Sequence, residues 1–351
     1  MKKLFGIIVC LLGIVSFGAC SLSQAAPIPP TVAPTTALTI PAGFTENEAK
    51  TLASLKQVDD YPLYTMRYYG EYDSLRTSTL PASEAARPPW ACSLFTALLD
   101  EDHLLYGRNF DWEFSPALLL FTDPPDGYAS VSMVSLASPK YTQETLRHIT
   151  DVPLAERRDL LYTALVPYDG MNEYGLAIGV AKVPDANMKA DPSKKTIGGL
   201  TIMREILDHA RDVDEAVEII KSYDIYFARG LSVHYLIADA RGKSVLVEFF
   251  LGKMYIIPNE QPWHSATNFL VASTKDPLGH DVRYDRINAR LSETQGKLDP
   301  NAAMDLLSEV SQGITQWSVV YQMSHGEVHV AMGRDYENVL TFRVSDYFDP
   351  K

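Results

Sequence analysis

Residues 90–112 read WACSLFTALLDEDHLLYGRNFDW. Two apolar runs, 92–99 and 104–112, flank the short polar turn Asp-Glu-Asp-His. Apolar runs of this length around a short polar turn predict a β-hairpin. Hairpin pairing returns the end of the second strand to the start of the first, so Arg108 and Asp111 are expected beside Cys92.

The predicted hairpin brings together a thiol, a guanidinium and a carboxylate. Cys92 is the only cysteine of the chain outside the apolar N-terminal segment, which holds Cys10 and Cys20. A guanidinium near a thiol favours the thiolate, and a carboxylate can hold an amine. The same residues also fit a plainer reading, in which Cys92 is a small buried hydrophobe and Arg108 and Asp111 form a surface ion pair at a turn.

Outside the hairpin, strand and helix patterns alternate in blocks. A short helix is expected near 49–55, with Thr45 and Glu48 as a capping box. Strands are expected at 61–69, 128–136, 175–183 and 233–257, the last as a hairpin around 239–243, and near the C-terminus around a turn at 324–326. Helices are expected at 201–223, broken near 211–212, and at 282–292 and 300–310. This order predicts sheets covered by helices and not a parallel α/β repeat.

Three further polar residues stand at the ends of predicted elements. Asn172 opens the stretch Asn-Glu-Tyr-Gly-Leu, Asn268 lies in Thr-Asn-Phe, and Arg283 precedes Tyr284. Asparagine amides at strand ends can donate hydrogen bonds to a developing oxyanion. Each asparagine taken alone also fits an ordinary turn residue.

Taken in order, these motifs resemble those of the choloylglycine hydrolase family of linear amide hydrolases. That family includes bile salt hydrolases and penicillin V acylases, with acid ceramidase as a more distant relative. The resemblance rests on the cysteine, the Gly-Arg-Asn-Phe-Asp stretch, Asn-Glu-Tyr-Gly-Leu, the asparagine after Thr267 and the arginine before an aromatic residue, and it covers roughly residues 90–345. It implies an α+β fold, the four-layer αββα sandwich of the N-terminal-nucleophile hydrolases.

The resemblance also implies roles for individual residues. Cys92 would be the nucleophile, and its own free α-amine, with an ordinary pKa of about 7.7–8.0, would be the general base. Asp111 would bind that amine. Arg108 and Arg283 would line the site and tune the thiol. Asn172 and Asn268 would form the oxyanion hole, and no metal or cofactor is implied.

One departure from the family concerns the residues upstream of the nucleophile. Bile salt hydrolases remove little more than the initiator methionine, whereas 91 residues precede Cys92 here. A free amine therefore requires cleavage between Ala91 and Cys92, as in the self-cleaving relatives. This divides the body into a pro-segment, residues 44–91, and a catalytic domain, residues 92–351.

The N-terminus carries a targeting signal. Lys2 and Lys3 precede an apolar run that is too short to span a bilayer comfortably and is typical of a signal peptide. Small residues before Cys20 resemble a bacterial lipobox, so residues 1–20 are interpreted as a lipoprotein signal with Cys20 as the acylated residue. Residues 21–43, rich in Pro and Thr, form a tether. The alternative is signal cleavage after Ala25 and a secreted or periplasmic protein.

Composition and motifs limit the partners. The net charge of −13 argues against a nucleic-acid partner, because a phosphate backbone needs a basic face. The expected partners are a membrane, reached through the lipid anchor, and a small amphiphilic N-acyl amide substrate. An acyltransferase using the same acyl-enzyme, and an amphiphile-binding lipoprotein without catalysis, are the alternatives. The sequence specifies neither the acyl nor the amine part, nor the oligomeric state.

Two histidine patterns suggest other chemistry. His264 precedes Asn268 closely enough for a Cys–His dyad to be conceivable. His325 and His329 flank a glutamate, but zinc proteases place His-Glu-x-x-His on a helix. A turn followed by a strand is the expected structure for the second pattern.

Overall fold

The computed structural model describes residues 38–76, 91–137, 140–184, 186–227 and 232–348. The chain divides into two units, Met1–Ala37 and Leu38–Lys351, and the structure described below belongs to the second. The predicted signal peptide, Cys20 and most of the tether lie outside the described residues. Within the described ranges, no helix is long and apolar enough to cross a membrane.

The predicted hairpin is confirmed and lies inside a six-stranded sheet. β3 (Ala91–Ala97) and β4 (Leu105–Asp111) pair antiparallel, with Cys92 opposite Phe110. β14 flanks β3, and β15 flanks β4 on the other side. The remaining strands of the sheet are β14 (Trp263–Ala266), β15 (Thr315–Gln322), β16 (Glu327–Met332) and β17 (Leu340–Arg343). The stretch around His325 is the expected turn between two strands.

A nine-stranded sheet forms the second layer. Its order is β1-β2-β5-β6-β7-β8-β11-β12-β13, and β2 and β5 are the only neighbours within this sheet that pair in parallel among the described strands. The region expected to be one hairpin, 233–257, is a hairpin followed by a third strand. The strand bounds are β1 (Lys56–Asp59), β2 (Leu63–Tyr68), β5 (Ala117–Thr122), β6 (Ser130–Ser135), β7 (Asp169–Asn172), β8 (Ala177–Lys182), β11 (Val233–Ala238), β12 (Ser244–Phe250) and β13 (Lys253–Pro258), with a separate parallel pair β9 (Lys195–Gly198) and β10 (Tyr223–Tyr226).

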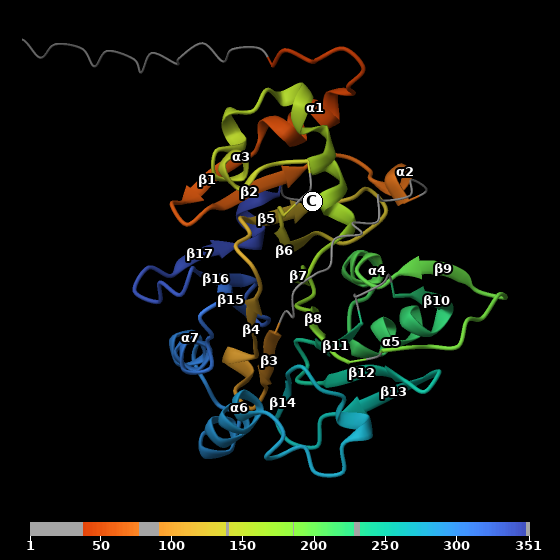
Figure 1. Ribbon diagram of the computed structural model, residues 1–351, viewed down its shortest axis with the longest axis vertical. Coiled ribbons are helices and arrows are strands. Elements are labelled where there is room, and N and C mark those ends of the chain that lie inside the picture. The colour runs from red at the N-terminus through yellow and green to blue at the C-terminus, as the bar shows by residue number, and fades with distance from the viewer. Residues whose placement is uncertain (1–37, 77–90, 138–139, 185, 228–231, 349–351) are drawn as a thin grey trace, which may run out of the picture. The chain divides into compact units, whose positions relative to one another are not determined.

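Helices cover the outer faces of the two sheets (Figure 1). α4 (Thr201–His209) and α5 (Val213–Ser222) pack on the nine-stranded sheet, and the predicted break between them is present. α6 (Val282–Glu293) and α7 (Pro300–Glu309) pack on the six-stranded sheet. The shorter helical pieces include α1 (Glu46–Ala53), α2 (Asp73–Arg76), α3 (Gln143–Arg147) and a 3₁₀ stretch at Leu154–Leu165. The predicted αββα sandwich is therefore confirmed.

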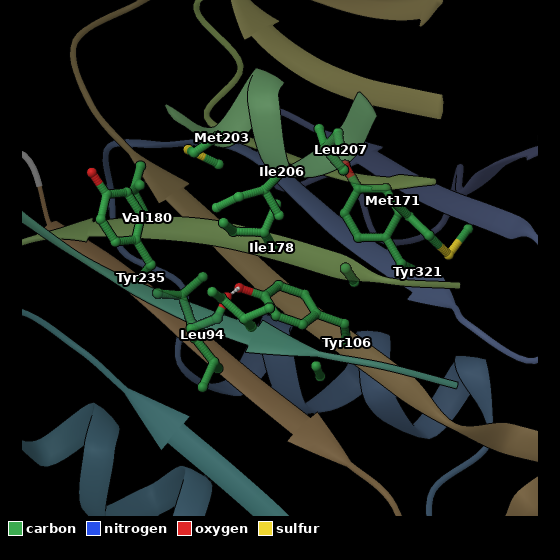
Figure 2. Close-up of a cluster of buried hydrophobic side chains, with 14 of the residues drawn as sticks. Leu94, Tyr106, Met171, Ile178, Val180, Met203, Ile206, Leu207, Tyr235 and Tyr321 are labelled. Atoms are coloured by element: carbon green, nitrogen blue, oxygen red, sulfur yellow. Dashed lines mark hydrogen bonds between the residues drawn. The ribbon is translucent and has the colours of Figure 1, made fainter. Parts of the chain in front are cut away.

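The largest core fills the space between the two sheets and beneath α4 (Figure 2). Leu94 and Tyr106 enter it from the hairpin, and the Tyr106 hydroxyl donates to the Leu236 carbonyl at 3.0 Å. Close approach of the sheets requires a glycine at position 179, because a Cβ there would lie 2.7 Å from the Tyr106 hydroxyl. The two sheets therefore pack closely beside β3, the strand on which Cys92 lies.

The described part of the chain before Cys92, residues 38–76, contributes to the same sandwich. Thr45 and Glu48 form the predicted capping box of α1. β2 lies inside the nine-stranded sheet, with Leu63 and Tyr64 fully buried. The apolar run 117–121 lies in β5, and its side chains are buried in the core on both faces of the sheet.

Candidate active site

The Cys92 side chain lies in the space between the two sheets and is fully buried. Cys92 is the second residue of β3, so its main chain lies at the end of the strand. Its thiol faces the nine-stranded sheet, on the same side of β3 as Leu94. Burial raises the pKa of the thiol, Arg108 opposes this shift, and Asp111 adds to it. The expectation that Arg108 alone would favour the thiolate is therefore incomplete, because desolvation outweighs it. The thiol at rest keeps its proton.

Arg108 reaches the thiol from the neighbouring strand. Its Nη2 lies 3.5 Å from the Cys92 Sγ, and its Nη1 pairs with the buried carboxylate of Asp169 on β7. The guanidinium also stacks over the Phe110 ring, at 4.8 Å from the ring centroid. Burial acts against the charged form, but Asp169 and Cys92 outweigh it and raise the pKa of Arg108. Arg108 is thus a fixed positive charge beside the sulfur.

Asp169 was not identified from the sequence, although it holds Arg108 in place. Its carboxylate accepts from the Tyr321 hydroxyl at 2.5 Å and from the Trp317 indole at 3.4 Å, besides Arg108. These contacts satisfy a charge that would otherwise be costly in the interior. An acidic residue inside the apolar stretch 164–171 is the signal that would have indicated it.

Asn268 meets the main chain of Cys92. β14 pairs with β3 so that Ala266 lies opposite Leu94, and the same register, continued by two residues, brings position 268 to position 92. The Cys92 N–H donates to Asn268 Oδ1 at 2.8 Å. Asn268 Nδ2 donates to the Lys182 carbonyl at 2.8 Å, which anchors the amide to the end of β8.

Arg283 completes the contacts of Cys92 from the first turn of α6. Its Nη1 donates to the Cys92 carbonyl at 3.0 Å, and its Nη2 donates to Asn268 Oδ1 at 2.9 Å. A cation near a helix N-terminus is unfavourable, because the helix dipole is positive there. Asp281, the N-cap of α6, offsets this by accepting from Arg283 Nη2 at 2.8 Å.

Asp111 lies at the end of β4, on the side of the sheet that α6 and α7 cover. Its carboxylate accepts from Gln312 Nε2 and Thr315 Oγ1, both at 2.5 Å, and lies 3.5 Å from Arg283 Nη1. Burial raises the pKa of Asp111, and the hydrogen bonds from Thr315 and Gln312 oppose that shift. In this uncleaved chain, Arg283 links the Asp111 carboxylate to the Cys92 carbonyl. The contact of Asp111 with a free α-amine stays a prediction.

The structure places Asn172 apart from this group, at the turn between β7 and β8. Both hydrogens of its amide are used, in bonds to the carbonyls of Leu207 and Ala210 at the end of α4. Its Oδ1 accepts from the backbone N–H groups of Tyr174 and Leu176. With no hydrogen left for an oxyanion, the predicted role of Asn172 in an oxyanion hole is wrong, and the turn reading holds.

The histidine alternatives do not reach the thiol either. His264 on β14 lies opposite Thr96, which is four residues along β3 from Cys92, or roughly 13 Å at strand spacing. Its ring contacts the Ser244 hydroxyl at 3.2 Å. Among the residues that the structure describes, no group of three or more His, Cys, Asp or Glu side chains is arranged to hold a metal ion.

Comparison with known proteins bears on this arrangement. Residues 164–346 match the model of the family described as acyl-coenzyme A:6-aminopenicillanic acid acyl-transferase. The chain belongs to this family. The match spans Asn268 and Arg283 but begins after the hairpin. The positions of Cys92 and Arg108 are therefore known from the structure of this acyl-transferase family member and not from the family match.

Solved structures agree with the fold of this acyl-transferase family member. A conjugated bile acid hydrolase from Clostridium perfringens superimposes with a TM-score of 0.51 at 16% identity, covering 73% of this chain and 93% of that one. A penicillin V acylase from Agrobacterium tumefaciens gives a TM-score of 0.50 at 16% identity, covering 72% and 86%. Comparison with curated proteins gives no significant match. The predicted fold, that of the N-terminal-nucleophile hydrolases, is confirmed, and the bile acid hydrolase and the penicillin V acylase share it.

Proposed function

We propose that this protein is an exported cysteine hydrolase that cuts linear amide bonds of N-acyl amides, with Cys92 as its nucleophile. One observation carries the proposal: each polar atom of Cys92 has a dedicated partner. Arg108 contacts its sulfur, Asn268 its nitrogen and Arg283 its carbonyl oxygen. A buried structural cysteine has no use for this set, whereas a nucleophile that must be aimed and activated does.

The proposed reaction begins with proton transfer from the thiol to the α-amine of Cys92. Because burial keeps the thiol protonated, a base is required, and the α-amine is the nearest one once it is free. The sulfur then attacks the substrate carbonyl carbon. The tetrahedral intermediate collapses to a thioester, and the leaving amine takes the proton from the α-ammonium group. Water then hydrolyses the thioester, which releases the acid and restores the thiol.

Asn268 is the proposed donor to the developing oxyanion. Within the described residues, its Nδ2 makes one hydrogen bond, to the Lys182 carbonyl, so the second N–H remains for substrate. Its Oδ1 at the same time holds the Cys92 nitrogen. One amide thereby aligns the base and stabilises the charge that the attack creates.

Activation is proposed to occur by cleavage between Ala91 and Cys92. Ala91 is the first residue of β3, and its carbonyl carbon is one bond from the Cys92 nitrogen. Attack of the sulfur on that carbon would form a thioester and break the C–N bond, and the thiol proton would pass to the departing Cys92 nitrogen, which becomes the free amine. Hydrolysis by water would then leave a carboxylate on Ala91 and a free N-terminal Cys92.

Export and anchoring are part of the proposal and rest on the sequence. The signal-like segment 1–20, a lipidated Cys20 and the tether 21–43 would hold the enzyme at the extracytoplasmic side of a membrane. Amphiphilic substrates are concentrated at such a surface. The class of substrate proposed is therefore an acyl amide with a long apolar part.

Acyl transfer to an amine is the second candidate function. The description of the matching family favours it, and the thioester would be the same, with an amine replacing water as acceptor. An acceptor competition assay distinguishes the two, because a transferase forms a new amide when a second amine is supplied at millimolar concentration. Formation of free acid alone supports the hydrolase.

The test is a substrate panel with matched variants. The processed enzyme receives equal concentrations of a glycine-conjugated bile salt, penicillin V, an N-acyl homoserine lactone, a fatty-acyl ethanolamide and an unacylated peptide, and released amine is measured. We expect turnover of at least one acyl amide, none of the peptide, and loss of activity in Cys92→Ser. Full activity of Cys92→Ala, or efficient cleavage of the peptide alone, would overturn the proposal. A binding protein without catalysis would leave every amide intact.

A further inference from the structure

A second buried polar cluster lies outside the site, in the nine-stranded sheet. His234 on β11 and Glu248 on β12 face each other across the antiparallel pair, as the register of Tyr235 opposite Val247 requires. Both side chains are fully buried, and His234 Nδ1 lies 2.9 Å from Glu248 Oε1. Buried pairs of this kind contribute little to stability compared with apolar residues of the same volume. Another reason is therefore needed for a carboxylate at this position.

The remaining contacts of Glu248 supply that reason. Its Oε1 accepts from the backbone N–H of Val271 at 2.9 Å, and its Oε2 accepts from that of Ala272 at 2.7 Å. These residues begin a 3₁₀ turn, Val271–Ser273, whose own N-cap residue, Leu270, provides no side-chain hydrogen bond. Glu248 thus caps the turn from a different strand and satisfies N–H groups that no neighbour along the chain satisfies.

The capped turn directly follows Asn268. The segment 267–272 leaves β14 and is fixed at one end by Asn268, whose Oδ1 binds the Cys92 nitrogen and Arg283. At the other end it is fixed by the carboxylate of Glu248. Between the two ends, Phe269 packs edge-on against Tyr284 of α6, with ring centroids 5.1 Å apart. The position of the Asn268 amide therefore depends on both ends of the segment.

We propose that Glu248, oriented by His234, is a positioning residue that holds segment 267–272 so that the Asn268 amide meets Cys92. The inference rests on the proposed roles of Cys92 and Asn268 and extends them to a pair that touches neither substrate nor thiol. His234 fixes the rotamer of the carboxylate. The carboxylate in turn fixes two consecutive backbone groups three and four residues after the oxyanion donor.

The first test compares Glu248→Gln with Asp208→Asn as a matched control. Asp208 is also a buried carboxylate in an ion pair, with Arg204 Nε at 3.1 Å, but it lies on α4 and contacts no residue of the segment through that pair. Glu248→Gln places an amide N–H where an acceptor is needed. We expect hydrogen exchange in a peptide spanning 267–274 to rise at least about 10-fold, because hydrogen bonds to a charged acceptor are lost. Asp208→Asn should leave exchange in that peptide unchanged.

Steady-state kinetics on an amide substrate that the enzyme hydrolyses provide a measurement that a purely structural role of Glu248 would leave unchanged. In Glu248→Gln we expect kcat to fall by up to about 100-fold with KM within a factor of about three, since a displaced oxyanion donor mainly affects the transition state. Asp208→Asn should lose stability without this change in kcat. Faster exchange in 267–274 with wild-type kcat would overturn the positioning role.

His234 supports a rescue experiment. In His234→Asn, the side-chain amide can place an N–H near the position of the Nδ1 donor, whereas His234→Leu removes the donor at similar volume. We expect His234→Asn to restore slow exchange and most of kcat relative to His234→Leu. Equal behaviour of the two variants would contradict a role for the hydrogen bond. If the wild type shows no hydrolysis at all, the exchange data still decide the positioning inference independently of the proposed function.

Discussion

The Asp169 carboxylate and the Cys92 sulfur are bound by the two ends of one buried guanidinium, that of Arg108. The carboxylate pairs with the buried guanidinium and holds it beside the sulfur. Burial raises the pKa of the Cys92 thiol, and the contact with Arg108 offsets only part of that shift. The sulfur is consequently poised for deprotonation by a base and is not a resting thiolate.

Asp169→Asn should destabilise the protein strongly. Removing one partner of a buried ion pair leaves an uncompensated charge, which costs about 3–5 kcal/mol. Chemical denaturation measures this loss, and Asp281→Asn, which alters a partly exposed pair, should cost clearly less. The double variant Arg108→Met with Asp169→Leu should regain stability while remaining inactive. Wild-type stability of Asp169→Asn would contradict the pairing described here.

The pH dependence of Cys92 alkylation reports its environment. Burial raises the pKa of the thiol, so the rate of iodoacetamide modification of the uncleaved chain, followed after a brief pH jump, should reach its midpoint above that of free cysteine. Asp111 adds to the shift and Arg108 opposes it. Asp111→Asn should therefore lower the midpoint, and Arg108→Met should raise it. Shifts of the opposite sign would show that neither charge acts on the sulfur as the geometry indicates.

Maturation should give two chains that stay together. If Ala91–Cys92 is cut, denaturing electrophoresis shows a fragment comprising residues 92–351, and Cys92→Ala remains uncut. Because β2 lies between β1 and β5, with Leu63 and Tyr64 fully buried, the upstream chain should co-elute with this fragment under native conditions. Each such apolar side chain contributes about 1.5–3 kcal/mol through burial. An active 92–351 chain that elutes alone would refute permanent association.

The two asparagines should behave differently. Asn268→Ala should lower kcat by on the order of 100- to 1,000-fold with a smaller effect on KM, because an oxyanion donor acts mainly in the transition state. Asn172→Ala should reduce stability by about 1–3 kcal/mol, since it leaves buried backbone groups unpaired, while the folded fraction keeps near-normal kcat. Steady-state kinetics and thermal unfolding of both variants provide the comparison. A rise in KM alone for Asn268→Ala would assign it to substrate binding.

His264 should make stability depend on pH. Burial lowers the pKa of His264 from 6.5 to about 4. The unfolded chain therefore binds more protons between these values, and the free energy of unfolding should fall as pH decreases from 6.5 toward 4. The free energy of unfolding should fall by about 2 kcal/mol over this range, because the His264 side chain is only partly enclosed and solvent reduces the effect. His264→Gln should flatten this part of the stability profile, and an unchanged slope in this variant would assign the titration to other groups.

Much of the fold was readable along the chain. The polar turn at 100–103 and its two apolar flanks predicted the β3–β4 hairpin, and with it the meeting of Cys92 and Arg108, because hairpin partners are close in sequence and their register follows from one turn. The same holds for α1 with its capping box and for the break between α4 and α5. Periodicity and capping are local properties, so the sequence expresses them directly.

The contacts across the sandwich were decided by the tertiary structure alone. Asn172 and Asn268 look alike in sequence, both near predicted strand ends, yet the sheet order directs one to the end of α4 and the other to Cys92. Asp169 and Glu248 acquire their roles only when β7 packs against β4 and when β12 meets the segment after β14. Such partners are tens to hundreds of residues apart, and no local pattern encodes which strands become neighbours. The sequence determined the hairpin that carries Cys92, the proposed nucleophile, and packing of the two sheets determined which polar groups surround it.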